Sequence, residues 1–126
     1  MSDTAWLFAG QGAQCVGMGL DVAAKFDVAD RVLREADAVL DFNLWETLRD
    51  GPDEELARTD VCQPAIVAVS LAIWEAAKRT HADLTVPSPA FCAGLSLGEY
   101  TALVAAGALD GPDAVALVRK RGRFMQ

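Results

Sequence analysis

The segment between Asp60 and Glu75 contains no charged residue. The apolar run over 61–80 is too long for one β-strand, so it predicts an α-helix. A helix without a polar face must be buried on most sides, and any fold of this chain has to cover it. Pro64 is compatible with the helix if it lies in the first turn, where its missing N–H has no helical partner to lose.

Two short apolar segments are predicted to be β-strands. Residues 4–10 (TAWLFAG) end in glycine and are expected to form a buried first strand, and residues 90–94 (AFCAG) a second. Strands that alternate with long helices favour an α/β fold with parallel strands. Two strands cannot form a stable sheet with both faces covered, so the sequence is interpreted as part of a domain.

The other helices are predicted from the spacing of apolar residues and from breaks at Gly and Pro. They are expected at 28–40, at 44–57 in two pieces broken at Gly51-Pro52, at 97–109 and at 112–125. Pro112 suits the first position of the last helix. A glycine-rich loop is expected at 10–19, and a surface connection at 80–89.

Composition argues against several classes of protein. The 126 residues suffice for one domain, and a hydrophobic content of 52% indicates a globular chain. The formal net charge of -7 argues against a nucleic-acid partner, because proteins that bind nucleic acids usually present a basic surface. No apolar run reaches the roughly 18 residues that cross a bilayer, and the N-terminus lacks a signal-peptide pattern. We therefore expect a cytoplasmic protein without a membrane partner.

The cysteines indicate neither a disulfide framework nor a metal site. Cys15, Cys62 and Cys92 are odd in number, widely spaced and not arranged as C-x-x-C. All three are expected to be small buried hydrophobic residues. No metal ligand is predicted anywhere in the chain.

A G-x-S-x-G pattern at 94–98 places Ser96 between the second predicted strand and a predicted helix. The pattern alone is weak, but a strand–turn–helix context forces the serine onto a sharp turn with small residues two positions to either side. The turn exposes the hydroxyl at a helix N-terminus, where free N–H groups favour developing negative charge. This context predicts a nucleophile, and a helix N-cap serine is the alternative.

The glycine-rich loop invites comparison with a nucleotide-binding loop. It begins like a dinucleotide fingerprint, but Cys15 occupies the position of the third glycine, and there is no G-K-[ST] motif. We expect instead that the loop passes close to Ser96 and contributes a backbone N–H to an oxyanion hole. A turn whose glycines only let the backbone approach something else is the alternative.

Four motifs occur together and in order: FAGQGAQ, QPA at 63–65, GLSLGEY and VRKRGRFMQ. This combination resembles the N-terminal portion of the acyltransferase family that includes malonyl-CoA:acyl carrier protein transacylases, and the resemblance covers essentially the whole chain. It implies that 1–126 form the first part of a large α/β-hydrolase-like subdomain, with parallel strands and a nucleophile elbow between strand and helix. The small ferredoxin-like subdomain and the C-terminal part would lie beyond residue 126.

The resemblance also implies a reaction. Malonyl would pass from malonyl-CoA, a coenzyme A thioester used as substrate, to acyl carrier protein in fatty-acid biosynthesis, without a cofactor. The implied site consists of Ser96 as nucleophile, Gln11 and Leu97 as oxyanion-hole donors, Gln63 as a lining residue and Arg121 as partner of the malonyl carboxylate. Leu95 departs from the family, which usually has histidine before the serine, and this departure affects fine tuning rather than the reaction.

The position of Arg121 can be checked with helix geometry. The helix that begins at 97 runs about 16 Å away from the serine by 107, and 112–121 return about 15 Å if the two helices are antiparallel. The guanidinium can therefore end near Ser96, where it would select a dicarboxylic acyl group. Alternatively, the basic residues here complement a helix C-terminus or attract an acidic carrier protein: Arg119, Lys120, Arg121 and Arg123.

The base for Ser96 is the missing part. His81 is the single histidine of the chain, and it falls in the expected surface connection, where a solvated cap is the usual role. The catalytic histidine of the family lies beyond the equivalent of position 126.

The chain is thus either part of an enzyme, completed elsewhere, or a non-catalytic module that binds acyl-CoA or a carrier. A polyketide rather than fatty-acid pathway also stays open, and an esterase-type hydrolase is disfavoured because it has no use for Arg121. Alone, the chain is expected to be inactive and to self-associate.

Overall fold

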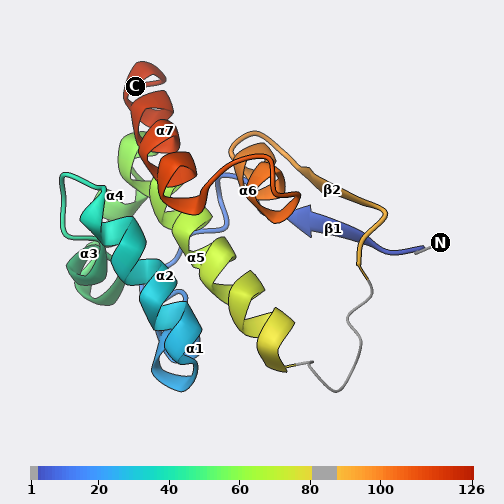
Figure 1. The fold of residues 1–126 in the computed structure, drawn as a ribbon. Coiled ribbons are helices and arrows are strands. Elements are labelled where there is room, and N and C mark those ends of the chain that lie inside the picture. The colour runs from blue at the N-terminus through green and yellow to red at the C-terminus, as the bar shows by residue number, and fades with distance from the viewer. Residues whose placement is uncertain (1–2, 81–87) are drawn as a thin grey trace.

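The structure is a computed structural model that describes residues 3–80 and 88–126. Its elements are β1 (Ala5–Phe8), α1 (Leu20–Lys25), α2 (Asp27–Ala38), α3 (Leu44–Asp50), α4 (Asp53–Ala57), α5 (Thr59–Thr80), β2 (Phe91–Gly94), α6 (Gly98–Ala105) and α7 (Gly111–Phe124). The long helix α5 runs through the centre, with α1 to α4 on one side and the two strands on the other (Figure 1).

The uncharged segment forms the central helix that the sequence predicts. Residues 61–69 are all buried, and α5 packs mainly against α7 and α2. By length and composition α5 is apolar enough to cross a membrane, so the expectation that no apolar run is long enough is wrong. However, 72% of its most apolar window is buried inside the protein, as in the core helix of a soluble fold.

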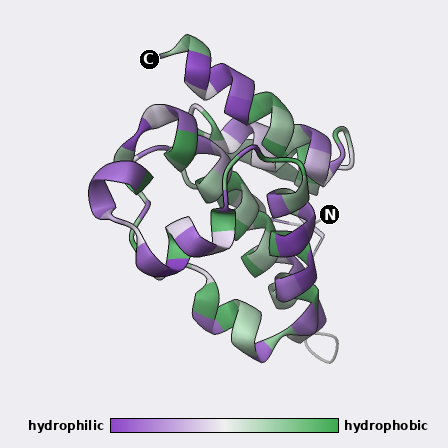
Figure 2. Ribbon diagram, turned by 90° about the vertical axis from the view of Figure 1, so that its left-hand side faces the viewer, coloured by the Kyte–Doolittle hydropathy of each residue, from purple (hydrophilic) through white to green (hydrophobic). Residues whose placement is uncertain are grey.

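The outer helices cover this core with one face each. In α2 the buried positions are Val28, Ala29, Leu33 and Ala36, which recur at helical spacing. Hydrophilic and hydrophobic residues both occur along the helix that ends at the C-terminus (Figure 2). The predicted break at Gly51-Pro52 is confirmed, because it separates α3 from α4.

Pro64 does not lie in the first turn of α5. The helix begins at Thr59, two residues before the predicted start, so Pro64 stands inside it. A residue at this position would normally donate its N–H to the carbonyl of Asp60, and proline cannot. That carbonyl instead accepts a hydrogen bond from Nη1 of Arg119 on α7.

The two strands form a parallel pair whose register places Ala5 beside Phe91 and Phe8 beside Gly94. The prediction of a buried first strand is wrong, because only one face of β1 is covered. Trp6 packs edge-on against Trp74 of α5, with ring centroids 5.9 Å apart. Leu7 points to the other face and is 77% exposed, since no element in the described part of the chain covers it.

One helix was not expected from the sequence, and another ends earlier than expected. Helix α1, which follows the glycine-rich loop, was not predicted, since its six residues are too few for a clear apolar period. Helix α6 ends at Ala105 rather than 109. Gly107 has a φ of 76°, a left-handed conformation that terminates helices, and its N–H donates to the carbonyl of Val104 at 3.0 Å.

Candidate active site

Ser96 lies in the tight turn between β2 and α6. Its φ is 56°, a left-handed conformation that is uncommon for residues other than glycine. Such strain persists only where the surrounding structure imposes it, and it concentrates at functional sites. The side chain is half-buried, and α6 begins two residues later at Gly98.

The flanking glycines are required by close backbone approaches. A Cβ on Gly94 would overlap the carbonyl carbon of Gly98, and a Cβ on Gly98 would lie 2.6 Å from the carbonyl oxygen of Phe8. Both approaches are far closer than van der Waals contact. A simple N-cap serine needs no such flanks, so the packing favours the interpretation of a constrained turn.

The glycine-rich loop passes beside this turn. A Cβ on Gly10 would lie 2.8 Å from the carbonyl oxygen of Leu95. Within the described residues, the backbone N–H groups of Gln11 and Leu97 have no hydrogen-bond acceptor. Gln11 is exposed, whereas the side chain of Leu97 is buried in the core. Leu97 directly follows Ser96, and Gln11 follows the glycine that lies beside Leu95. An oxyanion hole is formed from unpaired donors of this kind.

Arg121 reaches the serine from the far end of α7. Its Nη2 donates to Oγ of Ser96 at 3.0 Å, and its Nη1 donates to Oε1 of Gln63 at 2.6 Å. The proximity inferred from helix lengths is therefore confirmed. The guanidinium also lies 5.9 Å from the ring centroid of Tyr100, on α6.

Gln63 holds this guanidinium from a fully buried position on α5. Its Oε1 accepts from Arg121, and its Nε2 donates to Sδ of Met125 at 3.5 Å. Both ends of the amide are thus engaged, which fixes its orientation. Three segments that are distant in sequence contribute to one cluster: Gln63, Ser96 and Arg121.

The other basic residues of α7 divide between buried and surface positions. Arg119 pairs with Asp60, and only 12% of its side chain is exposed. Arg123 pairs with Asp41, and Lys120 is exposed. The expectation that Arg119 only complements a helix end or attracts a partner is therefore wrong, because its guanidinium is bonded to a buried carboxylate of the same chain.

Asp41 receives two guanidinium groups. Nε of Arg119 donates to its Oδ1 at 2.9 Å, and Arg123 bonds to its Oδ2. The hydrogen bond from Arg119 holds the pKa of the Asp41 carboxyl below its usual range. The sequence offered one signal for these ion pairs, which is that Asp60 stands directly before a long uncharged segment.

The cysteines only partly match the expectation that they are buried. Cys62 is buried on α5, and this burial raises the pKa of its thiol. Cys15 is exposed, which contradicts the expectation, because the glycine-rich loop that carries it lies at the surface. Cys92 is half-buried in β2.

Leu95, at the position of the family's usual histidine, is 81% exposed. His81 and the expected connection at 81–87 lie outside the described residues.

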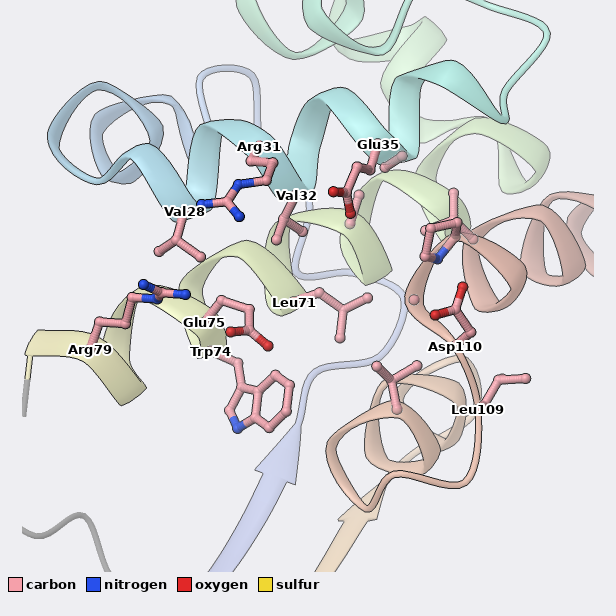
Figure 3. Close-up of a pocket in the computed structure, with 16 residues that line it drawn as sticks. Val28, Arg31, Val32, Glu35, Leu71, Trp74, Glu75, Arg79, Leu109 and Asp110 are labelled. Carbon is pink, nitrogen blue, oxygen red and sulfur yellow. The ribbon is translucent and has the colours of Figure 1, made fainter. Parts of the chain in front are cut away.

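A separate cleft of about 380 Å³ lies between α2, α5 and the start of α7. Figure 3 shows Arg31 and Arg79 toward one end and Asp110 toward the other, above a floor that includes Leu71. None of the residues that line this cleft belongs to the Ser96 cluster. The chemistry expected from the sequence is therefore not located in it.

Comparison with known proteins identifies the family. Residues 5–126 match the model of the acyl transferase domain. The malonyl CoA-acyl carrier protein transacylase of Escherichia coli is 44% identical over 126 residues, which are 100% of this chain and 40% of that protein.

Solved structures agree. An acyl carrier protein S-malonyltransferase from Vibrio cholerae has a TM-score of 0.88 at 46% identity, with coverage of 99% of this chain and 40% of that one. A malonyl-transacylase solved in complex with its type II polyketide acyl-carrier protein has a TM-score of 0.87 at 44% identity. The match covers 99% of this chain and 39% of that one. The chain thus spans about 40% of the length of these relatives. With its domain match over nearly its full length, this chain belongs to the acyl transferase domain family.

Proposed function

We propose that the complete protein transfers a malonyl group from malonyl-CoA to the phosphopantetheine thiol of acyl carrier protein, in fatty-acid biosynthesis. The relatives named for this reaction support the proposal. In it, residues 1–126 are the N-terminal part of the large acyltransferase subdomain, and the turn at Ser96 is its nucleophile elbow. The burial of α5 supports a soluble protein, which we place in the cytoplasm.

The proposed reaction has two matching steps. Oγ of Ser96 attacks the thioester carbonyl, its proton goes to a base, and the C–S bond breaks to release coenzyme A as the thiol. The carrier thiol then attacks the malonyl-serine ester and regenerates the hydroxyl. A covalent relay suits exchange between two thiols that use the same site in turn. The unpaired N–H groups of Gln11 and Leu97 would stabilise the oxyanion in both steps.

The observation that carries the proposal is the position of Arg121, whose guanidinium touches both Gln63 and Ser96. A malonyl group on Ser96 carries a free carboxylate a few atoms from the ester. A bidentate pair between this carboxylate and Arg121 would select malonyl over acyl groups that lack a charge. A plain esterase has no need of a cation at this place.

The base must come from outside the described site. We propose that it is supplied by the region of the relatives beyond the match, in the same chain or in another polypeptide. Alone, residues 1–126 would then bind acyl-CoA or a carrier without turnover, because removal of one member of a serine triad leaves little catalysis. A purely non-catalytic binding module is the alternative.

A role in a polyketide pathway is the second candidate. The similar structure in complex with a type II polyketide acyl-carrier protein favours it, because the same transacylase fold serves that carrier. The site would be unchanged, and only the carrier that accepts malonyl would differ. Loading assays with carriers of both types would separate the two roles.

Intact-mass analysis tests the proposal. The chain completed with the family's C-terminal portion is exposed to malonyl-CoA, and one malonyl adduct per chain is expected. Ser96→Ala should carry none, and the 126-residue chain alone should show no turnover with carrier. An adduct that persists in Ser96→Ala would refute the assignment of the nucleophile.

A further inference from the structure

Arg119 fills a hydrogen-bonding position that α5 cannot fill by itself. Because Pro64 has no N–H, the carbonyl of Asp60 lacks the donor that a helix normally supplies four residues later. Nη1 of Arg119 donates to this carbonyl and also to Oδ2 of the Asp60 carboxylate, the latter at 2.6 Å. One side chain on α7 thus bonds to both the backbone and the carboxylate of one residue on α5.

This ion pair is buried, which makes it a rigid connection. Only 12% of the Arg119 side chain and 4% of the Asp60 side chain are exposed. Nε of Arg119 donates to Asp41 at 2.9 Å, so the segment between α2 and α3 is tied to the same guanidinium. Asp60 also bonds to Arg58 at 3.1 Å and to the side chain of Gln126. Loss of the Arg119 bonds would still remove a buried ion pair and leave the Asp60 carbonyl without a donor, so α7 has little freedom to shift along α5.

The backbones of α7 and α5 approach each other beside the pair. Gly122 is buried, and a Cβ there would lie 2.6 Å from Cα of Asp60. At about 100° per residue, the contact line through Val118 and Gly122 leaves Arg119 and Arg121 about 80° to either side. The helix is thus held by one arginine on one flank and presents the other arginine to the serine on the opposite flank.

We infer that Arg119 is a positioning residue for acyl-group selection, because its bonds to Asp60 fix α7 where Arg121 meets Gln63 and Ser96. The inference rests on the proposed function, since it takes Arg121 as the group that binds the malonyl carboxylate. Arg119 bonds to Asp60 and Asp41 and lies over the ring of Phe42, so it acts on the acyl group through Arg121. Asp60 and Gln63 are three residues apart on α5, on one face, so a shift of α7 at the first changes the geometry at the second.

The test compares Arg119→Ala with Arg123→Ala in the chain completed by the family's C-terminal portion. Arg123 is the matched control, because it is on the same helix and also bonds to Asp41 but is 50% exposed. Malonyl-CoA and acetyl-CoA are supplied separately, and acylation of Ser96 is followed by intact mass. In Arg119→Ala, malonyl loading should fall about tenfold to a hundredfold and acetyl loading less than about threefold. Arg123→Ala should change both by less than about twofold.

A conservative variant keeps the test informative if Arg119→Ala does not fold. Arg119→Lys retains the charge and can still donate to Asp60, but it lacks the planar fork that serves the carbonyl and both carboxylates together. It should fold and show a smaller loss of malonyl loading, again with acetyl loading nearly unchanged. A loss of the same size for both acyl groups in a folded variant would make Arg119 a general stabiliser and overturn the inference, as would unchanged loading.

A structural readout separates this inference from the proposed function. If the unmodified protein acylates Ser96 with neither thioester, the proposed function fails. The crystal structure of Arg119→Lys or Arg119→Ala then decides the positioning role alone. We expect the Arg121 guanidinium to leave hydrogen-bond distance of Ser96 or Gln63, and a guanidinium that keeps both contacts contradicts the inference.

Discussion

Nη2 of Arg121 lies 3.0 Å from Oγ of Ser96, although the residues are 25 positions apart. The cation proposed to recognise the carboxylate and the hydroxyl proposed to attack the thioester thus contact each other directly. The guanidinium has five N–H donors, and the bonds to Ser96 and Gln63 use two of them. A malonyl carboxylate can therefore pair with Arg121 beside the serine, and this charge-assisted pair is stronger than the bond to the neutral hydroxyl.

Arg121→Ala in the completed protein should therefore separate malonyl from acetyl transfer. Loss of the carboxylate partner should cost malonyl transfer about 2–5 kcal/mol of transition-state stabilisation, while acetyl transfer is retained or increased. Steady-state kinetics with both thioesters measure this, and Lys120→Ala, an exposed neighbour, is the control. Equal losses for the two substrates would mean that Arg121 is structural.

Gly98→Ala should destabilise the fold by roughly 3 kcal/mol, because its new methyl group would overlap the carbonyl oxygen of Phe8. Gly111→Ala is the matched control. At that position, at the start of α7, the nearest atom to a Cβ is a methyl of Leu71 at 3.7 Å, which is ordinary contact. Denaturant unfolding compares the two variants. Similar stabilities would contradict the close approach between α6 and β1.

Pro64→Ala and Arg119→Ala should be energetically coupled. The single change at Arg119 removes a buried pair but leaves Asp60 bonded to Arg58, so it should cost about 2–3 kcal/mol. In the Pro64→Ala background, the helix regains an N–H for the carbonyl of Asp60, so part of this loss is recovered. The double-mutant cycle should show a coupling of about 1 kcal/mol, the net value of one hydrogen bond. Strict additivity of the two changes would show that the carbonyl does not depend on Arg119.

Thiol reactivity should distinguish Cys15 from Cys62. Burial raises the pKa of Cys62 above its ordinary value, so its thiol stays protonated at about pH 8, whereas Cys15 is exposed. Iodoacetamide should label Cys15 in the folded protein and Cys62 only after unfolding, as peptide mass mapping can show. Cys15→Ser is the control that removes the fast site.

The same shift has a consequence for stability at high pH. A raised native pKa favours the neutral thiol, so this contribution is fully present below the unfolded pKa and is lost as pH rises through the raised native pKa. Above about pH 9, unmodified protein should lose stability faster than Cys62→Ala, in unfolding experiments at matched ionic strength. Parallel stability curves would contradict the assignment.

The 126-residue chain should self-associate through the open face of its sheet. Because side chains alternate along strands and Ala5 is paired with Phe91, Leu7 and Phe91 lie on one face, where they are 77% and 62% exposed. Size-exclusion chromatography with light scattering should show oligomers that Leu7→Lys reduces. Val39→Lys, at an exposed apolar residue away from the sheet, should not. A monodisperse monomer would contradict this prediction.

Local patterns predicted most of the elements but not how the strands are covered. The uncharged segment before Glu75 predicted α5, because an apolar run of this length is too long for a strand. The burial of β1 could not be predicted from an apolar run, which looks the same whether one face or two are covered. The early end of α6 depended on Gly107, whose left-handed conformation is decided by local hydrogen bonds rather than by apolar spacing.

The cluster at Ser96 was predictable in part. Spacing and helix lengths placed Arg121 near the serine, but the role of Arg119 was missed. The carbonyl of Asp60 lacks a donor from its own helix only because Pro64 lies inside α5. The exact start of a helix, which decides this, is among the least predictable features of a sequence. Buried partners for an arginine also have no local signature, since Asp60 is 59 positions away.

The contacts that join α7 to α5 bridge long stretches of chain, with 58 positions between Gln63 and Arg121. Loops of this length close late in folding, after the local helices have formed, because their entropy must be offset before the contact stabilises anything. The ability to discriminate among acyl groups should therefore be among the last properties that the folding chain acquires.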